Sequence, residues 1–115
     1  MPRPDEHYFK EGCYIEEWHN TDGDQDCSVA HVRVEPQTQT KLHALKGTTE
    51  RYVILQGKGR VQVGDRKWEV AEGDVVVIPA DCSQSISNNE SDDLCFLAIC
   101  SPRFKEENYL ELATD

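Results

Sequence analysis

Three polar side chains in the middle of the chain have the types that acid–base chemistry or metal binding requires. His43 offers an imidazole nitrogen, Glu50 a carboxylate and Gln84 an amide oxygen. An imidazole and a carboxyl group can exchange protons with a substrate, and burial shifts their pKa values toward the range where this is efficient. The same nitrogen and oxygen donors could instead hold a divalent transition metal. Which chemistry applies depends on the elements that position these residues.

Those elements are predicted to be short β-strands. Alternating or apolar runs are separated by Gly, Pro, Asn and Asp turn signals, and Gly64-Asp65 has the form of a two-residue hairpin. The continuous apolar run 75–78 is predicted to be buried on both faces. Only residues 105–112 have a helical pattern. The predicted strands are 13–18, 28–34, 40–45, 51–56, 60–63, 67–70, 75–78, 84–88 and 94–100. This series predicts an all-β fold, either a sandwich or a closed barrel.

The composition indicates one globular domain and excludes several partners. A chain of 115 residues can bury one core but not two. Residues 1–11 are polar and are predicted to form a loose arm, followed by a single domain over 12–115. The formal net charge of −10 repels phosphate backbones and anionic lipid, so neither nucleic acid nor a membrane is expected as a partner. The five cysteines form no C-x-x-C pair, and their odd number favours a reduced, cytoplasmic protein over a secreted one with disulfides.

The spacing of glycines, proline and polar groups resembles the two motifs of the cupin family. These motifs are G-x5-H-x-H-x3,4-E-x6-G and G-x5-P-x-G-x2-H-x3-N. The matching positions are His43, Glu50 and Gly57 in the first motif, and Gly73, Pro79 and Asn88 in the second. The departures are Gln37 and Asp81 at two glycine positions, and Leu45 and Gln84 at two histidine positions. The resemblance covers residues 28–100 and is strongest to small single-domain members similar to mannose-6-phosphate isomerases.

The resemblance implies a double-stranded β-helix, or jelly-roll barrel, with a short C-terminal helix. If the barrel closes as in the family, His43, Glu50 and Gln84 converge in its lumen. Family members hold a divalent metal with two or three histidines and a glutamate, so these three residues could hold Mn, Fe, Ni or Zn together with water. The alternative is that His43 and Glu50 hydrogen-bond to each other in a polar pocket without an ion.

Two classes of function remain open from the sequence. One is a proton-transfer enzyme, a sugar or sugar-phosphate isomerase or epimerase with or without metal assistance, in which His43, Glu50 and Tyr52 are catalytic. The other is a non-catalytic module that binds or senses a small polar metabolite. Its ligand would be oriented by Gln84, Asn88 and Arg33. A metal-dependent dioxygenase is less favoured, because a non-haem iron centre takes two histidines and a carboxylate.

The resemblance also implies a homodimer. Single-barrel members of the family assemble by strand exchange or by sheet stacking at the N-terminal edge. Either arrangement would cover edge strands that a small barrel leaves open. The segment 13–18 is the one expected to cross between subunits.

Overall fold

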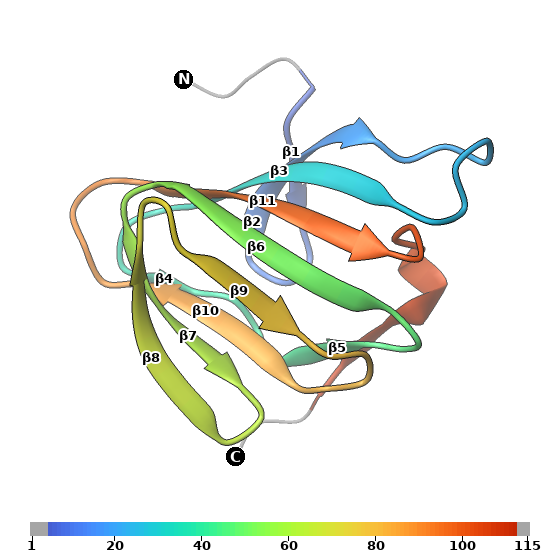
Figure 1. Ribbon diagram of the computed structural model, residues 1–115. Coiled ribbons are helices and arrows are strands. Elements are labelled where there is room, and N and C mark those ends of the chain that lie inside the picture. The colour runs from blue at the N-terminus through green and yellow to red at the C-terminus, as the bar shows by residue number, and fades with distance from the viewer. Residues whose placement is uncertain (1–4, 113–115) are drawn as a thin grey trace.

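Two antiparallel sheets pack face to face and form an all-β barrel (Figure 1). The computed structural model describes residues 5–112. The first sheet has the strand order β1-β2-β3-β11-β6-β9, and the second has the order β12-β5-β10-β7-β8 with β4 beside β10. The strands are β1 (His7–Phe9), β2 (Cys13–His19), β3 (Ser28–Val34), β4 (Thr38–Gln39), β5 (His43–Leu45), β6 (Thr49–Gln56), β7 (Lys58–Val63), β8 (Arg66–Ala71), β9 (Val75–Ile78), β10 (Gln84–Asn88), β11 (Leu94–Ser101) and β12 (Tyr109–Glu111).

Turn residues fix where these strands reverse. Gly64-Asp65 joins β7 to β8 as a two-residue hairpin, which confirms the prediction, and Gly64 has a φ of 60°. Gly57 ends β6 with a φ of 88°, and a Cβ at this position would lie 2.7 Å from the carbonyl oxygen of Asp93. Only glycine fits both this backbone conformation and this close approach.

Side-chain alternation separates the barrel interior from its surface. Along β6, Glu50, Tyr52 and Ile54 are buried, whereas the residues between them are more exposed. Phe96 of the neighbouring strand β11 packs against Tyr52 in a tilted arrangement, with 4.3 Å between ring centroids and 39° between ring planes. The apolar core lies between the two sheets, and it consists mainly of Val32, Val34, Tyr52, Ile54, Val61, Val70, Val76, Ile78, Ile86, Leu94 and Phe96.

Strand β9 differs from the prediction that it is buried on both faces. It is an edge strand that pairs with β6. Val76 and Ile78 face the core, but Val75 and Val77 are 58% and 53% exposed. The prediction was wrong because a continuous apolar run indicates a strand without telling whether its outer face is covered.

The two ends of the chain also differ from expectation. The predicted helix over 105–112 is a 3-10 turn, Glu106–Asn108, followed by strand β12, which pairs with β5. The turn is too short for an α-helix, and Tyr109 gains burial and ladder hydrogen bonds by pairing. In the segment expected as a loose arm, His7–Phe9 form β1 on the edge of β2. Residues 1–4 and 113–115 lie outside the described residues. Between residues 5 and 112, no helix is long and apolar enough to cross a membrane.

Candidate functional site

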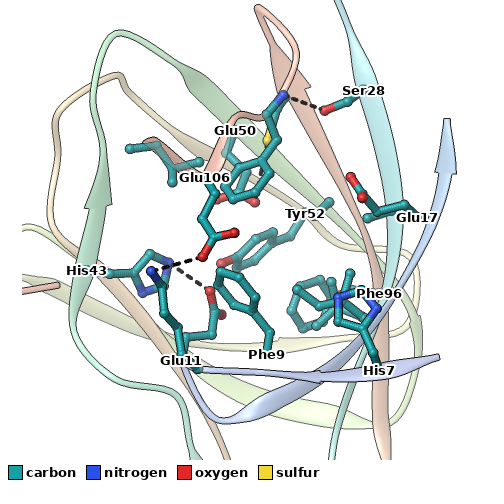
Figure 2. Close-up of a pocket in the computed structure, with 18 of the residues that line it drawn as sticks. His7, Phe9, Glu11, Glu17, Ser28, His43, Glu50, Tyr52, Phe96 and Glu106 are labelled. Atoms are coloured by element: carbon teal, nitrogen blue, oxygen red, sulfur yellow. Dashed lines mark hydrogen bonds and ion pairs between the residues drawn. The ribbon is translucent and has the colours of Figure 1, made fainter. Parts of the chain in front are cut away.

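A cavity of about 350 Å³ lies between the inner face of the first sheet, strand β5 and the N-terminal segment (Figure 2). This volume is within the range of small-molecule pockets. The inner wall is formed by buried residues of β5, β6 and β11, whereas His7, Tyr8, Lys10, Glu17 and Glu106 are exposed residues that line it. Its deep polar groups are His43, Glu11 and Glu50.

The imidazole of His43 is held in one orientation and one tautomer. Its Nδ1 lies 2.7 Å from the carbonyl oxygen of Lys41. Because a carbonyl only accepts, Nδ1 carries the proton in the neutral ring and Nε2 keeps a lone pair. The ring also stacks on Tyr109 with 5.0 Å between centroids. Burial lowers the pKa of His43, so its neutral form is favoured at neutral pH.

Glu11, which the sequence analysis did not single out, faces His43 across the cavity. Its Oε1 lies 3.5 Å from His43 Nε2, and Figure 2 shows the two side chains pointing toward each other. The backbone of Glu11 is fixed because its carbonyl accepts the N–H of Lys41 at 2.7 Å. The backbone of one residue, Lys41, therefore positions both acid–base groups. Burial raises the pKa of Glu11 to about 7.

Glu50 supplies a second carboxyl group from strand β6. Its Oε2 accepts a weak hydrogen bond from Cys100 Sγ at 3.8 Å, and its buried Oε1 has no hydrogen-bond partner. Burial, reinforced by the Glu11 carboxylate, raises the pKa of Glu50 to about 7. Cys100 and Cys13, the thiol beside Glu11, have pKa values raised mainly by burial, so both remain protonated.

Tyr52 and Gln84 form a buried hydrogen-bonded pair beside these groups. The Tyr52 hydroxyl donates to Gln84 Oε1 at 2.7 Å. Gln84 in turn lies next to both His43 and Glu50, and its polar contact favours the charged form of each. Burial raises the pKa of Tyr52 well above its usual value. Tyr52 thus keeps its proton and orients Gln84.

Asn88 and Arg33, the two remaining predicted ligand-binding residues, have other contacts. The Asn88 amide donates to the carbonyls of Val34 and Asp92, so it closes the loop between β10 and β11. Arg33 forms two hydrogen bonds with Glu6 and stacks on Tyr14. Neither side chain is among the residues that line the cavity.

The donor groups do not fit a divalent metal ion. Within residues 5–112, no group of three or more His, Cys, Asp and Glu side chains is arranged to hold one. Leu45, at the position of the second motif histidine, presents an apolar side chain to the cavity. The amide oxygen of Gln84 is engaged by Tyr52. The predicted set of His43, Glu50 and Gln84 is brought together, but as a proton-bearing cluster.

Comparison with known proteins places this geometry among related folds. The chain is 31% identical over 81 residues to an uncharacterised protein of Methanocaldococcus jannaschii. The aligned segment covers 70% of this chain and 65% of that protein. KdgF from Halomonas sp. has a TM-score of 0.78 at 18% identity, with 90% of each chain covered. Lactobacillus farciminis oxalate decarboxylase has a TM-score of 0.80 at 23% identity, covering 93% of this chain and 33% of that one.

A putative sugar phosphate isomerase from Acidithiobacillus ferrooxidans has a TM-score of 0.64 at 24% identity, covering 78% of this chain and 60% of that one. At these identities the structural likeness shows the fold alone. The cupin domain family matches residues 30–100, which include His43, Glu50 and Gln84. The chain therefore belongs to the cupin family.

Proposed function

We propose that this cupin binds a small polar metabolite and catalyses proton transfer beside a carbonyl group, as isomerases and epimerases do. The observation that carries the proposal is the orientation of the His43 imidazole, whose Nδ1 contacts the Lys41 carbonyl oxygen and whose Nε2 lies 3.5 Å from Glu11 Oε1 in the cavity. An imidazole with its Nδ1 proton held by a carbonyl is oriented to act as a base through Nε2.

The arrangement supports a complete proton cycle on its own residues. His43 Nε2 accepts a proton from the carbon next to the substrate carbonyl, and the protonated carboxyl of Glu50 donates to the carbonyl oxygen. The Glu50 carboxylate then takes the proton of the neighbouring hydroxyl group of the enediol, while the His43 imidazolium returns its proton to the former carbonyl carbon. This completes the isomerisation and restores both groups. Glu11 stabilises the imidazolium formed in the first step. The pKa values of about 7 for Glu11 and Glu50 suit groups that both give and take protons at neutral pH.

The roles of the other predicted residues change in this proposal. Tyr52 is a positioning residue, because its hydroxyl proton is engaged by Gln84. No step passes through a metal, because the side chains of the site do not form a ligand set. Sugars and sugar phosphates are the first substrates to test, since the fold is shared with a putative sugar phosphate isomerase.

The proposal is tested by hydrogen exchange, which needs no knowledge of the product. The protein is incubated in deuterium oxide with a panel of hydroxy-carbonyl compounds, and deuterium at the carbon next to the carbonyl is followed by NMR. We expect exchange with at least one compound in wild type and loss of this exchange in His43→Gln. The control is His19→Gln, which changes an exposed histidine in contact with Asp24 and should retain the exchange. Binding without exchange for every compound would contradict the enzyme and favour the sensing module.

We also propose that the protein is a homodimer whose subunits contact each other through the outer face of β6 and β9. Leu55, Val75 and Val77 are exposed there. A chain with a net charge of −10 repels its own copies, so a face that carries apolar side chains and the cation of Arg51, which lies opposite Val77, offers less repulsion. Strand β2, which was expected to cross between subunits, pairs with β1 and β3 of the same chain.

A further inference from the structure

The cavity wall carries negative charge that no free positive charge balances. Among the described residues that line it, Lys10 is the only lysine or arginine, and its ammonium pairs with Glu106 Oε2 at 3.3 Å. The lining carboxyl groups are those of Glu11, Glu17, Glu50 and Glu106. A ligand with a phosphate or carboxylate group would meet repulsion here without an opposing cation.

The deepest of these groups lacks the partner that a buried carboxylate requires. Glu50 is 8% exposed, and its Oε1 is buried with no hydrogen-bond partner in the structure. The other oxygen accepts a weak hydrogen bond from the Cys100 thiol, and the amide of Gln84 is a further neutral polar neighbour of the carboxyl group. Glu11 adds a second carboxyl group to the same cavity, and it faces a neutral imidazole. When these carboxyl groups are ionised, a bound group with N–H donors and a positive charge would offset the cost of burying their negative charge.

Aromatic rings form part of the same walls. Phe9, Tyr52 and Phe96 all line the cavity, and Figure 2 shows Phe9 and Tyr52 beside the facing pair of His43 and Glu11. The chain itself places an ammonium group next to one of these rings, Phe9, and next to Tyr109 beside the cavity. Lys10 Nζ lies 4.8 Å from the centroid of Tyr109 and 5.8 Å from that of Phe9. Aromatic faces attract cations through the negative potential above the ring.

From these contacts we infer that the pocket takes a small organic cation, an amine or quaternary ammonium compound without phosphate or carboxylate. Its charged nitrogen lies against Glu50 Oε1 and the carboxyl group of Glu11. The inference rests on the proposed function and narrows its substrates from sugars and sugar phosphates in general to amine-bearing compounds such as amino sugars. A neutral polyol would satisfy hydrogen bonds but leave the buried negative charge unbalanced.

The test compares ligands that differ in charge and little else. Dissociation constants are measured by NMR titration for glucosamine, glucose and the phosphate ester of glucose. Choline is compared with its uncharged analogue that has carbon in place of nitrogen. At pH 7, where the amine of glucosamine is mostly protonated, we expect glucosamine or choline to bind about tenfold or more tightly than its neutral counterpart, and the phosphate ester to bind weakest.

Matched variants locate the effect in the pocket. Glu50→Gln and Glu11→Gln each remove one buried carboxyl group, and we expect either to abolish the preference for the cation. Glu72→Gln, an exposed residue outside the cavity, makes the same change in net charge and should keep the preference. Equal or tighter binding of the neutral or phosphate ligands, or no binding of either cation, would overturn the inference. If a neutral or phosphate ligand showed hydrogen exchange that depends on His43, the proposed function would stand and only the inferred preference for a cation would be wrong.

Discussion

His43 and Glu11 become an acid–base pair because neighbouring backbone groups restrict each of them. The Lys41 carbonyl sets the imidazole tautomer, and the Lys41 N–H holds the Glu11 backbone. The sequence predicted His43, Glu50, Tyr52 and Gln84 because strand alternation and motif spacing are local properties. Glu11 could not be predicted in the same way, since its place depends on where the N-terminal hairpin docks. The one local signal of the turn at Glu11 was the next residue, Gly12, which has a φ of 106°.

Two positions that hold glycine in the motifs keep a positive φ in this chain, although other residues occupy them. Gln37 and Asp81 stand where the motifs have glycine, and they are the two non-glycine residues of the described chain with positive φ, 58° and 67°. Each is held by polar contacts. Gln37 Nε2 donates to the carbonyls of Asn89 and Glu90, and Asp81 Oδ1 accepts the N–H of Gly47.

The stability of variants at Gln37 should therefore depend on whether the new residue tolerates a positive φ. Both Gln37→Gly and Gln37→Ala remove the side-chain contacts, but only alanine keeps the unfavourable positive φ. We expect the alanine variant to be less stable than the glycine variant by about 1 kcal/mol. Urea unfolding measures the difference. Equal stability, or a more stable alanine variant, would contradict the assigned backbone.

The buried carboxyl groups should make stability depend on pH. Burial raises the pKa of Glu50 from 4.5 to about 7. As pH rises, the Glu50 carboxyl group therefore loses its proton in the unfolded state before it does so in the folded state. Its stabilising contribution to folding is complete below pH 4.5 and is lost as pH rises through about 7. From pH 5 to pH 8, we expect wild type to lose on the order of 2 kcal/mol more unfolding free energy than Glu50→Gln does.

Charge repulsion across the whole chain also changes with pH, so a control of equal charge is needed. Glu72→Gln, an exposed residue, should lose as much stability as wild type over the same pH interval. A Glu50→Gln variant with the same slope as wild type would show that Glu50 does not titrate in this interval.

At the scale of elements, strands from both ends of the chain complete a site that the central motifs begin. Strand β1 and the turn after it bring Glu11 to the cavity, and β12 pairs with β5 so that Tyr109 supports the His43 ring. The central strands follow from periodicity and turn residues, as the Gly64-Asp65 hairpin shows. The terminal strands are short and pair with distant partners, so local sequence does not reveal them. The sheet-edge position of β9 is likewise set by topology.

Strands β5 and β10 also account for the absence of a ligand set among the described residues. Leu45 lines the cavity, and Gln84 pairs with His43 and contacts Glu50, so histidines at these two positions would lie beside the existing polar groups. We expect Leu45→His/Gln84→His to bind about one Zn²⁺, Ni²⁺ or Mn²⁺ per chain after dialysis, because it supplies two further imidazoles. Elemental mass spectrometry measures the content.

The matched control is Leu45→Asn/Gln84→Asn, which introduces polarity without imidazole nitrogen. It should remain close to the low content of wild type. A wild-type protein that retains a full equivalent of metal and loses it in Glu50→Ala would contradict this account of the site.

The whole molecule is a strongly acidic barrel with exposed apolar side chains along one edge. These are Val75 and Val77 on β9 and Leu55 on β6. All five cysteines are free thiols. The cytoplasmic location inferred from their odd number stays a prediction, as does the homodimer.

The proposed dimer is tested by analytical ultracentrifugation. Wild type should sediment as a dimer, and Val75→Lys/Val77→Lys should shift it toward monomer, because opposed lysines cannot be buried together without a partner. Leu110→Lys changes an exposed apolar residue of the other sheet and should leave the dimer intact. A dimer that survives the β9 substitutions would place the interface elsewhere, and a monomeric wild type would contradict the homodimer.

The central claim is that His43 enters the cavity as a neutral base with Nε2 unprotonated. The most direct measurement is an NMR titration of the imidazole nitrogens in protein labelled with nitrogen-15, using His43→Gln to assign the signals. At neutral pH, the structure predicts a protonated Nδ1, an unprotonated Nε2 and a pKa below the usual 6.5. An imidazolium at neutral pH, or a proton on Nε2 in place of Nδ1, would contradict the account.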